Sequence, residues 1–246
     1  MELLNFKEYI TEDKDPQHHH VIAFGRMNPP TSGHMAVINK VDDVAKKQGA
    51  DHTVVTSHTQ DPKKNPLSPQ QKKRHLKRFS PSTNFKSSSP EQPTILHHVA
   101  ELHKKGVTHL HVVVGSDRKK EMTSLLNRYN NKKSSHGHYN FKKITVHSAG
   151  QRDPDSEGAS GVSGTKQREH ARTGNYAAFR KGVPDHVSHA HAKELMHDTR
   201  KGMGLHEDVD RGLFKAIFVT GGPGSGKDII IREAIAEGRI TELNFI

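Results

Sequence analysis

A histidine directly behind a loop rich in glycine and proline is the first residue whose setting indicates chemistry. In V-I-A-F-G-R-M-N-P-P-T-S-G-H-M-A-V-I, residues 21–38, an apolar strand pattern ends at Gly25 and a helical pattern follows within a few residues. The amino terminus of a helix carries roughly half a positive charge and favours phosphate. We therefore expect Gly25 to let a ligand approach the main chain, and His34 to donate a hydrogen bond as charge builds on a phosphate oxygen.

A second segment, V-S-G-T-K-Q-R at residues 162–168, is typical of a capped helix start that binds an anion. Ser163 is placed to cap the helix, and the backbone amides of Gly164 and Thr165 then point outward. Arg168 lies one turn farther along the same face, where its planar guanidinium could bridge the β- and γ-phosphates of a nucleotide. Taken alone, each segment is also compatible with an ordinary helix start that carries a surface histidine or arginine.

Two further segments could contribute to the same site. V-V-V-G-S-D, residues 112–117, ends a buried strand where open α/β sheets bind ligands, so Gly115 and Asp117 are candidates to line a nucleoside or acceptor pocket. Asp117 is equally well placed as a helix cap. The lysine-rich segment 61–78 is mostly a solvated face, but Lys64, and with it Lys72, could reach substrate phosphates.

Near the end of the sequence, G-G-P-G-S-G-K-D follows an apolar strand pattern and precedes a helical one, as a P-loop does. Asp228 replaces the Ser or Thr that normally contacts Mg²⁺. We expect nucleotide binding in the complete protein, and no kinase or ATPase action by this chain, because the acidic second motif and the lid are absent. The predicted phosphate-binding residues are Gly221, Gly222, Gly224, Ser225, Gly226, Lys227 and Asp228.

These candidate residues require an alternating β-α framework, which predicts a parallel sheet with helices on both faces. Ser68 and Gln71 form a predicted capping box with Pro69 at the first helical position. We expect a mobile loop at 80–93 and a polar loop at 150–164. Strands are predicted at 20–24, 52–57, 109–117 and 141–148, and helices at 32–47, from 68, at 94–105, at 163–181 and within 184–213.

Composition narrows the class of protein. The chain of 246 residues has no cysteine, which excludes disulfides and thiolate metal sites, and no apolar run long enough to span a bilayer. Its formal net charge of +11 is compatible with simple solubility or with a polyanionic partner, which could be a nucleoside triphosphate, a nucleic acid or an anionic surface. No cluster of residues has the spacing of an all-protein metal cage, so no protein metal site is expected. We expect a cytoplasmic protein.

The two phosphate-binding segments together resemble the nucleotidyltransferase superfamily of cytidylyltransferases, nicotinamide-mononucleotide adenylyltransferases and phosphopantetheine adenylyltransferase. Its first signature, G-x-F-x-P-x-(H or T)-x-G-H, is matched by Gly25, Pro29, Gly33 and His34, with Met27 for the aromatic residue and Thr31 for the first histidine. Its second, near I-S-S-T-x-x-R, aligns with residues 162–168. The resemblance implies catalytic roles for His34, Thr31 and Arg168, and a nucleotide-binding wall of Gly25, Arg26, Met27, Asn28, Gly33, Gly115, Asp117, Ser163, Gly164 and Thr165.

The resemblance implies a Rossmann-like α/β domain at 18–182, which transfers AMP or CMP from ATP or CTP to a small phosphorylated acceptor. Mg²⁺ is expected on the triphosphate. We expect a tail at 1–17, a helical linker at 183–213 and an incomplete P-loop module at 214–246. This order resembles bifunctional NAD-salvage proteins.

Two other classes stay open. The first residues resemble encapsulation signals of internal proteins of tailed bacteriophages, so the alternative is a packaged or nucleic-acid-binding accessory protein without turnover, in the host cytoplasm or the virion. A relative of class I aminoacyl-tRNA synthetases would share a similar histidine signature, but the chain lacks their length and an anticodon domain.

Overall fold

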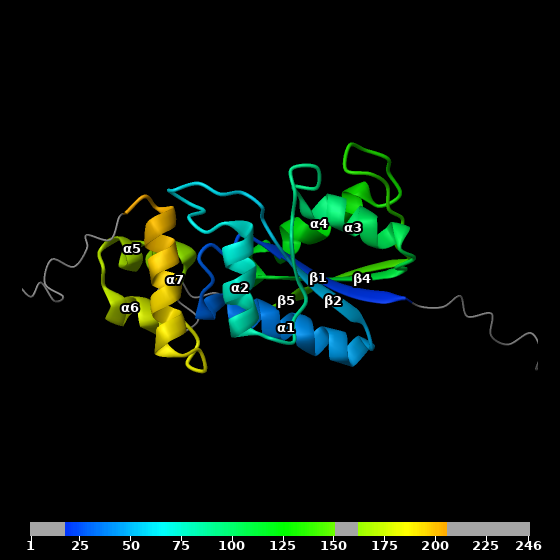
Figure 1. The fold of residues 1–246 in the computed structure, drawn as a ribbon. Coiled ribbons are helices and arrows are strands. Elements are labelled where there is room, and N and C mark those ends of the chain that lie inside the picture. The colour runs from blue at the N-terminus through cyan, green and yellow to red at the C-terminus, as the bar shows by residue number, and fades with distance from the viewer. Residues whose placement is uncertain (1–17, 151–161, 206–246) are drawn as a thin grey trace, which may run out of the picture. The chain divides into compact units, whose positions relative to one another are not determined.

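The computed structural model describes residues 18–150 and 162–205, all within the first of two compact units, Met1–Glu207. The second unit, Asp208–Ile246, contains the predicted P-loop and lies outside the described residues, as does the predicted tail at 1–17. Figure 1 shows a central sheet flanked by helices, with a further group of helices at one end.

Five parallel strands form the sheet in the order β3-β2-β1-β4-β5. The chain progresses outward from β1 to β3 and then returns to the other side of β1 to form β4, so the order reverses between β1 and β4. This reversal is a topological switch point, where ligands bind at the carboxyl ends of the strands. The strands are β1 His19–Gly25, β2 Asp51–Thr56, β3 Phe85–Ser87, β4 His109–Val114 and β5 Lys143–Ser148.

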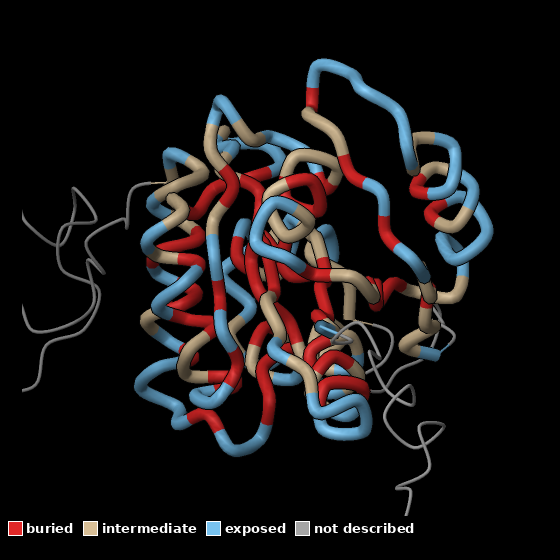
Figure 2. Tube along the Cα trace, turned by 90° about the vertical axis from the view of Figure 1, so that its right-hand side faces the viewer, coloured by how far each residue is buried: buried red, intermediate tan, exposed pale blue. Residues whose placement is uncertain are grey.

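Helices cover both faces of the sheet, as predicted. Successive strand residues alternate between the two faces: Val21 and Ala23 pack against α1, whereas Ile22 packs on the opposite face against α3 and α4. The buried interior runs through the strands in Figure 2, and exposed residues lie on the outer turns. The helices are α1 Ser32–Gln48 and α2 Pro69–Phe79 on one face, and α3 Ile95–Lys104 and α4 Lys119–Tyr129 on the other.

The remaining helices, α5 Gly164–Arg172, α6 Tyr176–Lys181 and α7 His189–Gly202, form a layer next to α2 (Figure 1). A separate apolar cluster joins them to Phe79 of α2 through Ala171, Phe179 and Leu195. The helix predicted within 184–213 is therefore α7, and it packs against the other helices of the first unit. The single helix expected at 163–181 is two helices, because the chain turns at Gly174 with φ of +72°.

Two local predictions have clear outcomes, and one helix was not predicted. The capping box is present: Ser68 accepts from the Gln71 N–H at 3.2 Å, and Gln71 accepts from the Ser68 N–H at 2.9 Å. The loop expected at 80–93 contains the edge strand β3, which pairs with β2 through Phe85. Helix α4 was missing from the prediction.

Candidate active site

A cavity of about 310 Å³ opens at the switch point. Its walls come from the carboxyl ends of β1 and β4, the residues after β5, and the amino-terminal turns of α1 and α5. His34 and Arg168, which belong to the two separate sequence motifs, line this same cavity. Other predicted residues on its wall are Gly25, Arg26, Met27, Asn28, Gly33, Lys64, Gly115, Asp117, Ser163, Gly164 and Thr165.

The ring of His34 is oriented by Thr31, the N-cap residue directly before its own helix. The backbone N–H of Thr31 donates to Nδ1 of His34 at 3.0 Å. Because Nδ1 accepts this hydrogen bond, it carries no proton, and the hydrogen of the neutral ring resides on Nε2. His34 therefore has an N–H donor on the ring edge opposite Thr31.

Arg168 bridges the second motif to the first. Its Nη1 donates to the backbone carbonyl of Asn28 at 2.7 Å, a contact between positions 140 residues apart, and its Nη2 donates to the hydroxyl of Thr165 at 3.1 Å. Ser163 caps α5 by accepting from the Lys166 N–H at 3.1 Å. A Cβ at Gly164 would lie 3.4 Å from both the Arg168 guanidinium and the Asn28 carbonyl, so glycine permits this close approach.

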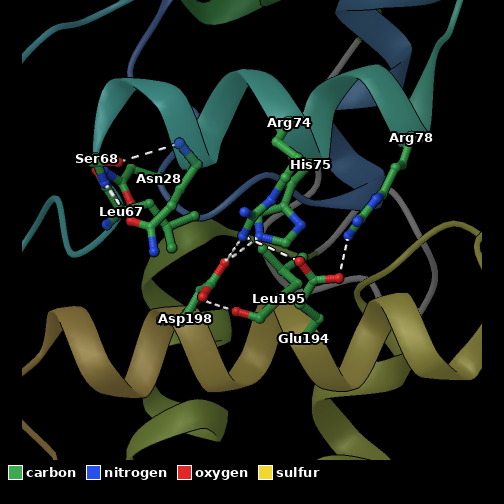
Figure 3. Close-up of polar contacts among 11 residues, drawn as sticks. Asn28, Leu67, Ser68, Arg74, His75, Arg78, Glu194, Leu195 and Asp198 are labelled. Carbon is green, nitrogen blue, oxygen red and sulfur yellow. Dashed lines mark hydrogen bonds and ion pairs between the residues drawn. The ribbon is translucent and has the colours of Figure 1, made fainter.

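Asn28 anchors the loop between β2 and α2 to the end of β1. Its Nδ2 donates to the Leu67 carbonyl at 2.9 Å, and its Oδ1 accepts from the Leu67 N–H at 3.0 Å. Figure 3 shows Asn28 and Leu67 facing each other beside the start of α2. Both residues are buried. The adjacent Met27 has a positive φ of 44° that non-glycine residues rarely adopt, as occurs at functional turns.

Ion pairs between α2 and α7 hold the helical layer that carries the second motif. Asp198 accepts from Arg74 at 2.6 Å and from His75 Nε2 at 2.8 Å, and Glu194 pairs with Arg78 at 2.6 Å (Figure 3). His75, Glu194 and Asp198 are close enough together to suggest a metal site. The two arginines already neutralise the carboxylates, so this cluster is better explained as an ionic contact between helices.

The charge of the cavity wall favours a polyanion. Among the described lining residues, Arg26, Lys64, Arg118 and Arg168 are cationic, and Asp117 supplies the one carboxylate. Burial, followed by the nearby Arg26, lowers the pKa of Arg168 from its ordinary value, but an arginine remains protonated near neutrality. A bound triphosphate would relieve the repulsion between these cations.

Comparison with known families agrees with this geometry. A cytidylyltransferase-like family model matches residues 22–170, more than half of the chain. The chain belongs to the cytidylyltransferase-like family. This membership supports nucleotidyl transfer with nucleoside triphosphate substrates. No curated protein matches the chain. Within residues 18–150 and 162–205, no helix has both the length and the apolar character needed to cross a membrane.

Two predicted residues of this cytidylyltransferase-like domain lie elsewhere than expected. Thr31 is fully buried, and its hydroxyl donates to the Val162 carbonyl at 3.1 Å. The Thr31 hydroxyl therefore does not face a phosphate. Thr31 instead positions His34 and the second motif. Lys72 is also fully buried; its ammonium donates to the Ser57 carbonyl, and burial lowers its pKa to about 8. Lys72 is therefore unable to bind substrate from the cavity wall.

Other wall residues were missed by the sequence argument. Ala149 and Gly150 line the cavity directly after β5, just as Gly115 does after β4. The rule that carboxyl ends of parallel strands meet at one edge could have identified them. Arg118 was missed because it lies in a short 3₁₀ turn, Ser116–Arg118, that has no sequence signature.

Proposed function

We propose that the chain transfers a nucleoside monophosphate, AMP in preference to CMP, from the triphosphate to a phosphate-bearing acceptor with release of pyrophosphate. The observation that carries this proposal is the shared cavity of His34 and Arg168. Nicotinamide mononucleotide is the first acceptor to test, since the order of motifs resembles that of NAD-salvage proteins. A cytoplasmic enzyme is proposed.

In the proposed reaction, an oxygen of the acceptor phosphate attacks the α-phosphorus in line. The new P–O bond forms as the bond to the α,β-bridging oxygen breaks, and pyrophosphate leaves with that electron pair. The Nε2–H of His34 would donate to oxygens of the α-phosphate, where charge accumulates in the transition state. Arg168 and the amino terminus of α5 would hold the β- and γ-phosphates, and Lys64 and Arg26 would neutralise the acceptor phosphate.

The wall fits a Mg²⁺ ion that arrives with the triphosphate. Asp117 is the one carboxylate among the described lining residues, which is too few for an all-protein cage. Bound Mg²⁺ would neutralise phosphate charge, while the protein groups align the two substrates.

The experiment is an assay of pyrophosphate release with ATP or CTP, Mg²⁺ and a panel of phosphorylated acceptors that begins with nicotinamide mononucleotide. We expect release that depends on one acceptor, and a product that contains the transferred nucleotide. His34→Ala serves as the matched inactive variant. The absence of release with every acceptor, together with tight and salt-sensitive DNA binding, would instead support an accessory protein that has lost turnover.

A further inference from the structure

Four histidines on three neighbouring strands lie on one face of the sheet. His19 belongs to β1, His109 and His111 to β4, and His147 to β5, strands that lie side by side (Figure 1). Alternate residues of a strand share a face, and Val21, two residues after His19, packs against α1, so the four imidazoles lie on the α1 side. None of the four histidines lines the cavity at the switch point.

Three of these imidazoles form a continuous row across the strands. Nδ1 of His19 lies 2.9 Å from Nε2 of His111, and Nδ1 of His111 lies 3.0 Å from Nε2 of His147. The ring of His109 stacks on that of His19, with 4.6 Å between the ring centroids. Because the histidines come from separate strands, no spacing along the sequence indicates this row.

The environment of the row keeps its rings uncharged near neutral pH. Burial, followed by His109, lowers the pKa of His19 from its ordinary value. Burial, followed by His147 and His19, lowers the pKa of His111 to about 4. A neutral imidazole offers one nitrogen lone pair and is the commonest metal ligand in proteins.

We propose that a divalent transition-metal ion, Ni²⁺ or Cu²⁺, binds between Nδ1 of His19 and Nε2 of His111. Imidazole nitrogens lie about 2.0–2.1 Å from a bound metal, so two of them at a right angle are about 2.9 Å apart, and at the tetrahedral angle about 3.3 Å apart. The observed 2.9 Å matches the right angle. Right angles between nitrogen ligands are typical of the square-planar or tetragonal sites of Ni²⁺ and Cu²⁺.

His147 holds the ligand ring of His111 in place. With the metal on Nε2 of His111, the proton of that ring resides on Nδ1 and is donated to Nε2 of His147 at 3.0 Å. A partner on the other ring nitrogen is usual for a metal-binding histidine, because it fixes the orientation of the ring and raises its basicity. Each ring keeps its one proton, so binding releases none. His19 and His109 are partly exposed, which lets water occupy the other coordination positions.

The test is an NMR titration of the full chain, labelled with ¹⁵N-histidine, with Ni²⁺ alone as the probe and no nucleotide present. Paramagnetic Ni²⁺ broadens the signals of nuclei close to it, and single replacements by asparagine assign those signals. At less than one equivalent of Ni²⁺ we expect the signals of His19, His111 and His147 to broaden first, before those of the exposed His191. Excess Mg²⁺ should leave this order unchanged, because imidazole favours transition metals over Mg²⁺.

Variants separate the ligands from their surroundings, with the affinity for Ni²⁺ measured by isothermal titration calorimetry. His147→Phe removes only the partner of His111 and should weaken binding roughly 10–100-fold, whereas His19→Ala removes a ligand and should weaken it more than about 100-fold. His191→Ala should bind as the unmodified chain does. The proposal is overturned by unchanged affinity in His19→Ala, by equal broadening of all histidines, or by first broadening of His75, which would place the ion between α2 and α7. Should His147→Phe fail to fold, His19→Ala and the order of broadening in the unmodified chain decide.

Discussion

Replacing Asn28 by aspartate tests whether this side chain holds the loop between β2 and α2 against the end of β1. The substitution keeps the size and the acceptor oxygen that receives the Leu67 N–H at 3.0 Å. It removes the Nδ2 donor, which lies 2.9 Å from the Leu67 carbonyl, and puts a second oxygen there. Two oxygens would then face each other without a hydrogen between them.

The expected loss follows from burial. Asn28 is 3% exposed and Leu67 is 0% exposed, so water cannot replace the missing donor. A buried carbonyl left without its hydrogen bond costs about 1–3 kcal/mol, and enclosing an ionised carboxylate adds to this. We expect Asn28→Asp to lower the free energy of unfolding by about 3 kcal/mol at pH 7.

The sign of the pH dependence is a second signature. Burial raises the folded-state pKa of the introduced carboxyl, and its protonated form can donate to the Leu67 carbonyl again. The deficit relative to the unmodified chain should therefore be largest at pH 7 and shrink as the pH falls toward 5. Urea denaturation of both proteins at the two pH values measures it, with the exposed Asn84→Asp as the control. A deficit no larger than that of the control would refute the anchoring role.

Four other outcomes are expected. His34→Ala should lower kcat on the order of 100-fold, because it removes a hydrogen-bond donor to the transition state. Replacement of the exposed His191 by alanine should leave kcat unchanged. Steady-state kinetics measure both variants, and equal rates would remove His34 from the mechanism. Arg168→Ala should raise the KM for the nucleotide about 10–100-fold. The KM of Arg168→Lys should lie between those of the unmodified chain and Arg168→Ala, because lysine keeps the positive charge but lacks the planar guanidinium that makes two hydrogen bonds. An unchanged KM would contradict triphosphate binding by Arg168. Gly202→Ala should cost about 1–3 kcal/mol in urea denaturation, because its Cβ would overlap the Pro66 carbonyl oxygen, and Lys201→Ala next to it should be nearly neutral. Burial lowers the pKa of His20 and of His111 from 6.5 to about 4, so both side chains are neutral in the folded chain near pH 7. The free energy of unfolding should therefore fall by about 2 kcal/mol per histidine between pH 7 and pH 5, because the unfolded chain binds a proton at each histidine that the folded chain does not. A flat profile in that interval would disprove their neutral burial.

Helices and strands were predictable from the sequence wherever apolar residues recur at a regular spacing over a long segment. Helix α1 buries Ile38, Val41 and Ala45 at helical spacing, and the sequence shows that spacing directly. Strand β3 was missed because it has three residues in a segment rich in serine and proline, which is typical of a loop. The break between α5 and α6 at Gly174 was missed because one glycine inside a helical pattern is often tolerated.

Side-chain direction at the site was harder to predict than the site itself. Thr31 and His34 are both polar residues in one motif, yet the hydroxyl of Thr31 is turned to the Val162 carbonyl, 131 positions away in the sequence. Lys72 belongs to a lysine-rich helix that reads as a solvated face, yet α2 turns this one residue under the end of β2. Both directions are set by packing between distant segments, and no local pattern records such packing.

The helical layer of α5, α6 and α7 contacts the candidate active site through the loop that follows β1. Arg168 of α5 donates to the Asn28 carbonyl at 2.7 Å, and the Ser32 N–H donates to the Gly182 carbonyl after α6 at 2.8 Å. Because α5 contacts the first motif and shares an apolar cluster with α7, the cluster and the ion pairs that hold α7 on α2 also set the relative position of His34 and Arg168. Residues 183–205, which contain no phosphate-binding residue of their own, therefore belong to the machinery that aligns the two motifs.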